Sequence, residues 1–405
     1  MPSPLSKYFN AIGAKRLSDV EVTPAASNQH EFNGITRFKE IFGEEKINFQ
    51  GDFVYLVDDE SLLIKDEGIL TWYDARLNHS TRTEFRLYYS TNPVIDKAAA
   101  GDLVIIGRTG KDKLSVIISP KGSTSEQQLL YLFGLDEVGS KFVIRDYIEN
   151  DEELNFAGRY IIESLGFEVP DTEPDFLEDL VKKFRSRFPP TSVFSAYARS
   201  TLTEVSPKEE PDRTLIAWLD REELLFRTLE NHIVATKLTE GFGSDGKDVD
   251  EFIFFSLSVQ NRRKSRAGFA FENHLETIFK ENGIHYTRGA RTERNNKPDF
   301  LFPGIEYYHD IEFSEELLTM LGVKTSAKER WRQVLSEAER IKDKHLITLE
   351  PGISKNQTEE MIAQNLQLVI PFPLLETYTI EQQRHLITLS DFISIVNQKQ
   401  SKNHG

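Results

Sequence analysis

The sequence predicts two domains, a mainly-β pseudobarrel followed by an α/β domain. Short runs of β-branched and aromatic residues fill the chain up to about residue 119, whereas the second half combines long amphipathic helices with short strands. At 405 residues the chain can also bury more than one core. A stretch with two prolines and four acids, residues 166–175, separates the halves. We therefore predict domains over residues 1–170 and 179–405, joined by a linker over 171–178.

The first domain is expected to hold at least five short strands, each bounded by turn residues. The predicted strands cover residues 52–57, 61–65, 84–89, 102–106 and 113–118. A short helix over residues 34–43 should end at a glycine, and helical patterns follow from residue 124 and across 151–165. Five or more short strands are typical of a small barrel or pseudobarrel.

The second domain is expected to open with helices over residues 176–188 and 214–238, the latter with an apolar stripe that suits a scaffold core. Further along, apolar and charged residues alternate in 310–313 and 321–325, which predicts a hairpin or two neighbouring strands. Residues 326–341 have helical spacing, so that Ser326 would be the N-cap and Glu337 would lie on the third turn.

This order of elements places acids and a lysine in a pattern suited to phosphodiester hydrolysis. Two carboxylates can bind a divalent metal through oxygen, and a lysine can stabilise the oxyanion. We predict Asp299 and Glu337 as metal ligands and Lys324 as the phosphate-facing lysine. Asp310 and Glu312, on one face of the predicted strand, are second-ranked alternative ligands. The ordinary alternative is an exposed turn and a solvated lysine–glutamate pair.

The composition argues against a membrane protein, a secreted protein and a protein that uses cysteine chemistry. No run of 18 apolar residues is present, which argues against a membrane span, and the first residues lack the apolar core of a signal peptide. Without cysteine there are no disulfides, thiolate ligands or cysteine nucleophile. We expect a cytoplasmic protein. The net charge of −16 does not exclude DNA as a partner, because basic side chains are concentrated at residues 262–266.

A row of charged residues in the first domain could contact base edges. Arg82, Glu84 and Arg86 alternate along a predicted strand, which would project all three from one face. Arginine can bind guanine bidentately, and glutamate can accept a hydrogen bond from cytosine. Residue chemistry alone nevertheless favours an ordinary solvated strand on which Glu84 neutralises two arginines.

Several stretches of the second half closely resemble, in order, the catalytic domain of EcoRII-like type II restriction endonucleases. They are residues 258–268, 271–279, 296–303, 308–310, 323–325 and 330–333. The resemblance implies an α/β PD-(D/E)xK nuclease domain that cleaves duplex DNA with Mg²⁺ and leaves a 5′ phosphate. It also implies a CC(A/T)GG-type target and a cognate cytosine DNA methyltransferase as functional partner.

The same resemblance assigns the catalytic residues. Asp299 and Glu337 match the metal ligands, Lys324 matches the lysine, and Glu272 matches a further acid that joins the active site. In these enzymes the second acid comes from a helix instead of the position two residues before the lysine. Here that position is Gly322, which cannot bind a metal, so the chain follows the family pattern.

DNA contacts are also implied. A short run that reads C·G pairs in the family is matched here by Lys328, Glu329 and Arg330. This match is chemically reasonable, because arginine can donate to guanine and glutamate can accept from the amino group of cytosine. Arg262 matches another contact, and its basic neighbours Arg263, Lys264 and Arg266 could touch phosphates.

In the first domain, residues 15–18 and 72–86 resemble the two DNA-clasping arms of the EcoRII-like effector domain, a pseudobarrel of the plant B-three type. The implied function is binding of a second, effector copy of the DNA. The residues that this resemblance suggests as DNA contacts are Arg16, Arg76, Arg82, Glu84 and Arg86.

Three alternatives stay open. The protein could be a DNA-binding regulator with an inactive nuclease fold, although all four acid and lysine positions are filled. It could be a nuclease with a different CC–GG core target. Its N-terminal domain could also bind protein or modified DNA.

Overall fold

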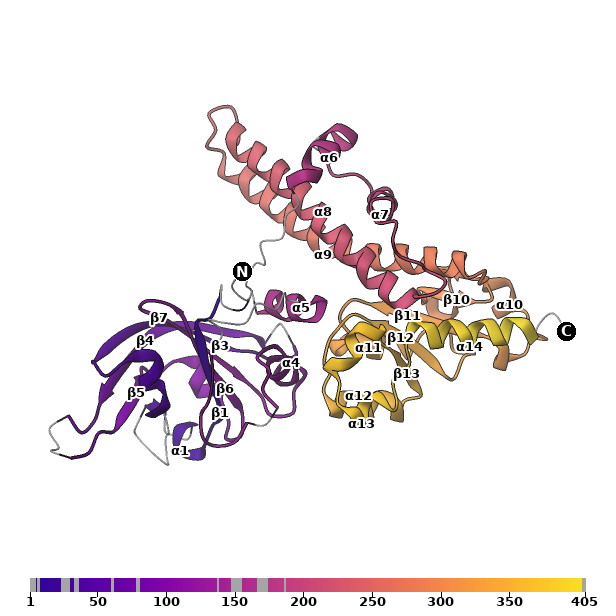
Figure 1. Cartoon of the computed structure of the whole chain (residues 1–405). Helices are drawn as coiled ribbons and strands as arrows, with labels where there is room; N and C mark the ends of the chain where they lie inside the picture. The colour runs from indigo at the N-terminus through magenta and orange to yellow at the C-terminus, as the bar shows by residue number, and fades with distance from the viewer. Residues whose placement is uncertain are drawn as a thin grey trace. The chain divides into compact units, whose positions relative to one another are not determined.

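The computed structural model describes Leu5 and residues 8–22, 30–32, 36–59, 62–77, 81–136, 138–146, 155–165, 174–185 and 187–402 (Figure 1). The chain divides into two compact units. Unit 1 comprises Met1–Phe167 with Pro351–Gln357, and unit 2 comprises Glu168–Glu350 with Thr358–Gly405. The predicted linker 171–178 begins outside the described residues, and from Pro174 onward the chain is helical. Residues 174–178 of the predicted linker are thus helical, and the bounds of the linker stay a prediction.

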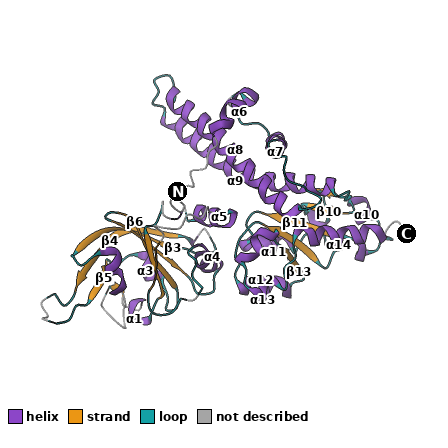
Figure 2. Cartoon of the chain, in the orientation of Figure 1, coloured by secondary structure: helices purple, strands orange, loops and turns teal. Residues whose placement is uncertain are grey.

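Within its described residues, unit 1 is built on an eight-stranded sheet of order β2-β5-β4-β3-β7-β6-β1-β8 (Figure 2). Its strands are β1 Ala11–Arg16, β2 Glu31–Phe32, β3 Ile47–Tyr55, β4 Ile64–Asp74, β5 Phe85–Tyr89, β6 Leu103–Gly110, β7 Lys113–Ser119 and β8 Val143–Asp146. β3 and β7 run parallel, and the other neighbouring pairs are antiparallel. A mainly-β first domain is confirmed, and all five predicted strands overlap observed ones. The sequence patterns missed β1, β2 and β8.

An aromatic core holds this sheet together. Trp72 of β4 stacks on Phe85 of β5 with ring centroids 4.9 Å apart, and Phe42 packs edge-on against Trp72 at 5.4 Å. Phe42 ends a short helix that stops at Gly43, whose φ of +82° suits glycine, as predicted. The helices of unit 1 are η2 Thr36–Phe38, α1 Asp19–Val22, α2 Lys39–Phe42, α3 Pro93–Lys97, α4 Thr124–Leu132 and α5 Phe156–Ser164.

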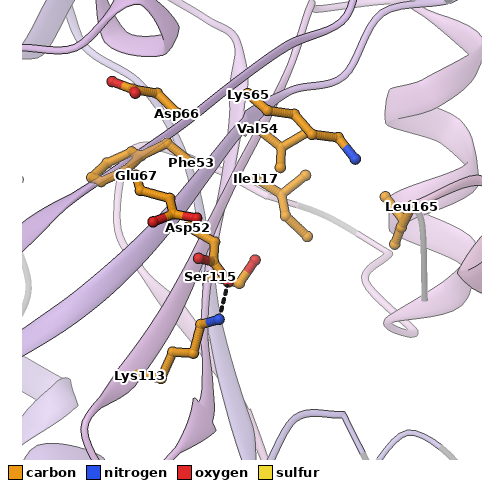
Figure 3. Close-up of a pocket in the computed structure, with 10 residues that line it drawn as sticks. All are labelled: Asp52, Phe53, Val54, Lys65, Asp66, Glu67, Lys113, Ser115, Ile117 and Leu165. Atoms are coloured by element: carbon orange, nitrogen blue, oxygen red, sulfur yellow. Dashed lines mark ion pairs between the residues drawn. The ribbon is translucent and has the colours of Figure 1, made fainter. Parts of the chain in front are cut away.

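A hollow of about 630 Å³ opens on β3, β4 and β7 of unit 1 (Figure 3). Asp52 and Lys113 form an ion pair of 2.8 Å within it, and Glu67 and Leu165 also line it. None of the candidate catalytic or DNA-contact residues lines this hollow.

Unit 2 places helices around a five-stranded mixed sheet of order β13-β12-β11-β10-β9. The strands are β9 Thr287–Arg288, β10 Phe300–Phe302, β11 Thr319–Lys324, β12 Lys344–Thr348 and β13 Leu366–Val369. β9, β10 and β11 are antiparallel neighbours, and β11, β12 and β13 run parallel. The α/β prediction for the second domain is therefore confirmed.

The helices of unit 2 begin with η4 Pro174–Phe176, α6 Leu177–Phe184, α7 Thr191–Ser200, α8 Pro211–Glu240 and α9 Val249–Glu281. Those that follow are η5 Glu293–Asn295, α10 Ile305–His309, η6 Glu315–Leu317, η7 Lys328–Arg330, α11 Trp331–Val334, α12 Lys355–Ala363, η8 Phe372–Thr377, α13 Ile380–Gln383 and α14 Leu389–Lys402. α8 contains the helix predicted over 214–238. Among the described residues, no helix is both long and apolar enough to cross a membrane.

The C-terminal part of α9 is fixed to the sheet by aromatic contacts. Phe279 meets Phe300 and Phe302 of β10 edge-on, with ring centroids 5.2 and 5.3 Å apart. Phe392 of α14 contacts Phe302 from another side at 5.6 Å. This packing places the helix that carries Glu272 against the strand that follows Asp299.

The strand predicted over 310–313 is absent. β11 pairs instead with β10, and residues 310–313 form a turn after α10, in which the Glu312 amide donates to Asp310 Oδ1 at 3.0 Å. Ile311 is 87% exposed, so the alternation of apolar and charged residues does not mark a buried face. Asp310 and Glu312 therefore do not share a strand, and that premise for the alternative ligands is wrong.

The helix predicted over 326–341 is also wrong beyond Val334. Glu337 follows α11 in a turn, because Ala338 has a φ of +49° and Lys344 Nζ binds the carbonyl oxygens of Glu337, Ala338 and Ile341. These bonds replace the helical ones that a longer α11 would make. Ser326 is not a helix cap, since the backbone amides there are bound by Glu350.

Candidate active site

An acid and a lysine meet at the ends of two paired strands. Asp299 stands directly before β10, and Lys324 is the last residue of β11. Lys324 Nζ donates to Asp299 Oδ2 at 2.9 Å, and the backbone amide of Val323 donates to the same oxygen at 2.6 Å. Both side chains are about one-fifth exposed, at 18% and 19%. The pair is thus fixed by the sheet and open to solvent on one side.

Glu337 adds a second carboxylate beside this pair. Burial raises the pKa of Glu337 to about 7; the charges of Lys324 and Lys344 lower it, and that of Asp299 raises it further. Its Oε2 is buried without a hydrogen-bond partner among the described residues. A buried charge without a partner is costly, and a bound cation would remove that cost.

Glu272 lies on α9 and feels the same charges. Burial raises its pKa, hydrogen bonds from Arg288 lower it, and the nearby Asp299 charge raises it. The structure therefore brings together Glu272, Asp299, Lys324 and Glu337, the four residues selected from the sequence.

The sequence patterns missed Arg288 of β9. Its Nε and Nη2 donate to Glu272 Oε2 at 3.1 and 2.8 Å, and its Nη1 donates to Asn273 and to Glu276. The neighbouring Gly289 amide donates to the carbonyl oxygen of Asp299 at 3.0 Å. Arg288 thus fixes the Glu272 carboxylate, and the residue after it, Gly289, is hydrogen-bonded to the backbone of Asp299. A two-residue strand gives no alternation, so no sequence signal marked this arginine.

The candidate base-reading run Lys328–Arg330 forms η7, which begins four residues beyond Lys324. Arg330 is exposed, and Lys328 has the uncommon backbone φ of +25°. The Glu329 side chain lies outside the described residues. Their role as DNA contacts stays a prediction.

The basic stretch on α9 is mostly engaged within unit 2. Arg262 is exposed and lies over the ring of Phe188 at 4.4 Å. Arg263 pairs with Glu230 at 2.6 Å, and the buried Arg266 pairs with acids of α8. Burial of Arg266 contradicts a phosphate contact there, while Arg262 keeps its candidacy. The Lys264 side chain lies outside the described residues.

The charged row of unit 1 is largely self-neutralised. Glu84 pairs with Arg76 at 2.5 Å and with Arg86 at 2.7 Å, and Arg86 also binds the buried Glu31 at 2.6 Å. This is the ordinary arrangement that residue chemistry favoured. Arg82 is exposed, just before β5, and makes no ion pair with any described residue. Asn78, His79 and Ser80 of the resembling stretch lie outside the described residues.

Arg16, the remaining candidate, ends β1. It forms an ion pair with Glu126 and donates to the carbonyl oxygens of Gly101 and Val138 at 3.3 and 3.4 Å. Its side chain is one-quarter exposed. These bonds hold β1 to its surroundings, and a DNA contact from Arg16 stays a prediction.

The centre suits a cation with few protein ligands. Among the described residues, no group of three or more histidines, cysteines and acids could enclose a metal ion. Asp299 and Glu337 nevertheless supply carboxylate oxygens, one of them buried and unpartnered. Mg²⁺ commonly binds through one or two carboxylates and completes its shell with water and phosphate oxygens.

Residues 226–393 match the sequence model of the family described as EcoRII C terminal. The type II restriction enzyme EcoRII of Escherichia coli is 44% identical over 216 residues, which are 53% of this chain and 52% of that enzyme. The chain thus spans about half the length of the relative it matches. The resemblance seen in the sequence is confirmed over this part of the chain.

Solved structures of restriction endonucleases give weaker matches. The structure of metal-depleted Ecl18kI in complex with uncleaved, modified DNA has 20% identity and a TM-score of 0.46, covering 58% of this chain and 87% of that one. The PspGI–substrate DNA complex has 16% identity and a TM-score of 0.43, covering 53% and 94%.

Proposed function

We propose that this chain, which carries a domain of the EcoRII C-terminal family, is a type II site-specific restriction endonuclease with a PD-(D/E)xK nuclease domain in unit 2. The observation that carries the proposal is the meeting of Asp299, Lys324 and Glu337, with Glu272 beside them. Two carboxylates and a lysine at one open edge of a sheet are the groups that metal-dependent phosphodiester hydrolysis requires.

Asp299 and Glu337 would hold the Mg²⁺ ion. The buried Oε2 of Glu337 supports this fit, since the oxygen has no hydrogen-bond partner within the described residues. When bound, such an ion polarises the scissile phosphate and lowers the pKa of a water.

The chain's own groups hold the reacting phosphate in place. Lys324 Nζ presents a positive charge at the edge of the site, where it stabilises negative charge that develops on a phosphate oxygen. The Val323 amide keeps Asp299 Oδ2 in position, so that the carboxylate does not rotate away. Glu272, fixed by Arg288, adds negative charge next to Asp299 and strengthens attraction for a cation.

The finer assignments follow from the resemblance. The target is a CC(A/T)GG-type site, read in part by Lys328, Glu329 and Arg330, and cleavage leaves a 5′ phosphate. Unit 1, as an effector pseudobarrel, binds a second DNA copy, with Arg82 as its best exposed candidate contact. A cytosine DNA methyltransferase would protect the same sites.

Digestion of a plasmid with mapped CC(A/T)GG sites, with and without Mg²⁺, tests the proposal. Discrete Mg²⁺-dependent fragments that end at those sites are expected. Discrete fragments elsewhere would retain the nuclease and overturn the target. No cleavage with Mg²⁺, even when a short cognate duplex is added as effector, would contradict the nuclease and favour a DNA-binding regulator.

A further inference from the structure

A buried carboxylate lies under the turn that joins the catalytic lysine to the base-reading run. Glu350 has no exposed surface, and its Oε2 accepts hydrogen bonds from the amides of Ala327 and Lys328 at 2.7 and 3.0 Å. The Ser326 hydroxyl donates to the same oxygen at 3.2 Å. One carboxylate oxygen therefore binds three donors from three consecutive residues.

Chain topology brings Glu350 to this turn. β11 and β12 are parallel neighbours, with Lys324 opposite Thr348, so the segments that follow both strands leave the same edge of the sheet. Glu350 is itself held, because its amide donates to Thr348 Oγ1 at 3.2 Å and its carbonyl oxygen accepts from Tyr378 at 2.6 Å. The carboxylate is thus a fixed point against which the turn is set.

The turn needs such a fixed point. Lys328 has a φ of +25°, which is unfavourable for a residue with a side chain and persists only where surrounding contacts impose it. η7 has no side-chain cap of its own, so Glu350 binds the amides that a helix cap would otherwise satisfy. A charged acceptor makes the stronger kind of hydrogen bond.

The run Lys328–Arg330 is also held by the helix that follows it, α11. Trp331 and Val334 of α11 are buried, at 1% and 0% exposed. Arg330 therefore projects outward between an anchored turn and an anchored helix. Side chains that read bases need support of this kind, because small displacements change which base edge they reach.

Hydrogen bonds satisfy only one of the two oxygens of the Glu350 carboxylate within the described residues. Burial raises its pKa, against the lowering effect of the Lys328 and Ala327 amides. Its other oxygen, Oε1, is buried without a partner among the described residues. A buried carboxylate with one unsatisfied oxygen reduces stability relative to an apolar side chain, which suggests that the group serves the turn.

We propose that Glu350 is a positioning residue for sequence specificity, which fixes the backbone of Ser326–Lys328 so that Lys328–Arg330 meet the C·G pairs of the target. This inference rests on the proposed function. Glu350 does not touch DNA in this account; it acts through the residues whose amides it binds.

The test compares the full-length Glu350→Ala, Glu350→Gln and wild-type proteins in single-turnover cleavage. The substrates are a duplex with one CC(A/T)GG site and duplexes with one C·G pair replaced. We expect Glu350→Ala to lower the ratio of cognate to substituted cleavage rates about tenfold or more, the scale of one base-pair readout. Cleavage of the cognate duplex at saturation should change by less than about threefold. Glu350→Gln keeps an acceptor oxygen that is neutral and therefore weaker, so its ratio should lie between those of Glu350→Ala and the wild type.

Asp212 supplies the matched control. It is another buried carboxylate of unit 2, and it accepts hydrogen bonds from the amides of Phe372, Leu389 and Ser390. These residues do not include the base-reading run. Asp212→Ala should therefore lower thermal stability without changing the discrimination ratio.

Unchanged discrimination in a folded Glu350→Ala protein would overturn the proposal, and so would an equal loss in Asp212→Ala. If Glu350→Ala does not fold, Glu350→Gln decides, since its weaker neutral acceptor should reduce discrimination measurably and an unchanged ratio would overturn the idea. Failure of the proposed function is distinguishable, because then the wild-type protein would not cut the cognate duplex.

Discussion

Two glutamates, one in each unit, show how differently a folded chain can treat the same charge. Glu84 of unit 1 is bound by Arg76 and Arg86, and the hydrogen bond from Arg86 is the main cause of its lowered pKa. Glu337 of unit 2 is half-buried beside Asp299, and this burial raises its pKa to about 7. Its Oε2 has no partner within the described residues.

The charge of Glu84 is already compensated by ion pairs within the fold, whereas a bound cation would compensate that of Glu337. A neutralised row such as that of Glu84 is compatible with DNA binding but does not require it, since its ion pairs suffice to explain it. Carboxylates held in an unfavourable environment beside a lysine are harder to explain without a cation. Unit 2 therefore holds acidic groups that a bound cation would compensate, whereas the charged row of unit 1 is already neutralised by its own ion pairs.

The largest effect should come from Asp299→Ala. Loss of this proposed metal ligand should reduce cleavage by about a thousandfold or more, because several kcal/mol of transition-state stabilisation would depend on it. DNA binding in Ca²⁺, measured by gel shift, should be nearly unchanged. Asp310→Asn, which alters a nearby exposed acid, should cut normally. If Asp299→Ala abolished binding as well, Asp299 would be a structural residue.

Arg288→Ala sharpens the comparison within unit 2. Without its guanidinium, Glu272 is free to rotate away from Asp299, and cleavage should slow about tenfold to a hundredfold. Lys280→Ala is the control, since Lys280 pairs with Glu276 on the surface but does not touch Glu272. The two variants are compared by single-turnover rate at several Mg²⁺ concentrations. Equal rates for Arg288→Ala and wild type would show that Glu272 needs no such support.

Arg86→Ala and Arg82→Ala test the row in unit 1. Arg86→Ala leaves the buried Glu31 without its ion pair and should destabilise unit 1 by about 1–3 kcal/mol. Arg82→Ala, which removes an exposed arginine, should cost about 0.5 kcal/mol or less and should weaken binding of a second duplex. Denaturant unfolding measures the stability of each variant. Gel shift measures the binding of a second duplex, with both variants made in the Asp299→Ala protein. A second duplex bound equally well by Arg82→Ala would contradict the contact assigned to it.

Glu337→Gln should produce a small but diagnostic change in the stability of the metal-free protein. Replacing the buried charge by a neutral amide should stabilise the metal-free protein by about 1 kcal/mol. Mg²⁺ should raise the melting temperature of the wild type but have little effect on the variant. A variant less stable than wild type without metal would mean that the charge is already compensated, as it is for Glu84.

Site residues could be predicted from the sequence where their chemistry depends on residue type. The local structure that carries them was harder to predict, because it depends on contacts between distant parts of the chain. Asp299 and Lys324 meet as predicted because strands place successive residues reliably. Glu337 lies close enough to both to interact electrostatically with them, yet it is on a turn instead of the predicted helix. The long-range bonds from Lys344 that form that turn leave no local signal.

Residues that act across the fold were harder to foresee. Arg288 binds an acid 16 positions earlier, and Glu350 binds amides more than 20 positions earlier, so neither forms a motif. The apparent strand at 310–313 failed for the opposite reason. Its local pattern was correct for a strand, but β10 occupies the position beside β11.

We propose that the Asp299–Lys324–Glu337 centre cuts DNA with a divalent ion. The most direct test uses one duplex with a single CC(A/T)GG site, labelled on each strand in turn, incubated with the wild-type protein in Mg²⁺, in Ca²⁺ or without metal. We predict cleavage in Mg²⁺ alone, at one position per strand, with a 5′ phosphate on the product. Binding without cleavage in Mg²⁺, in the presence of a second cognate duplex, would contradict it.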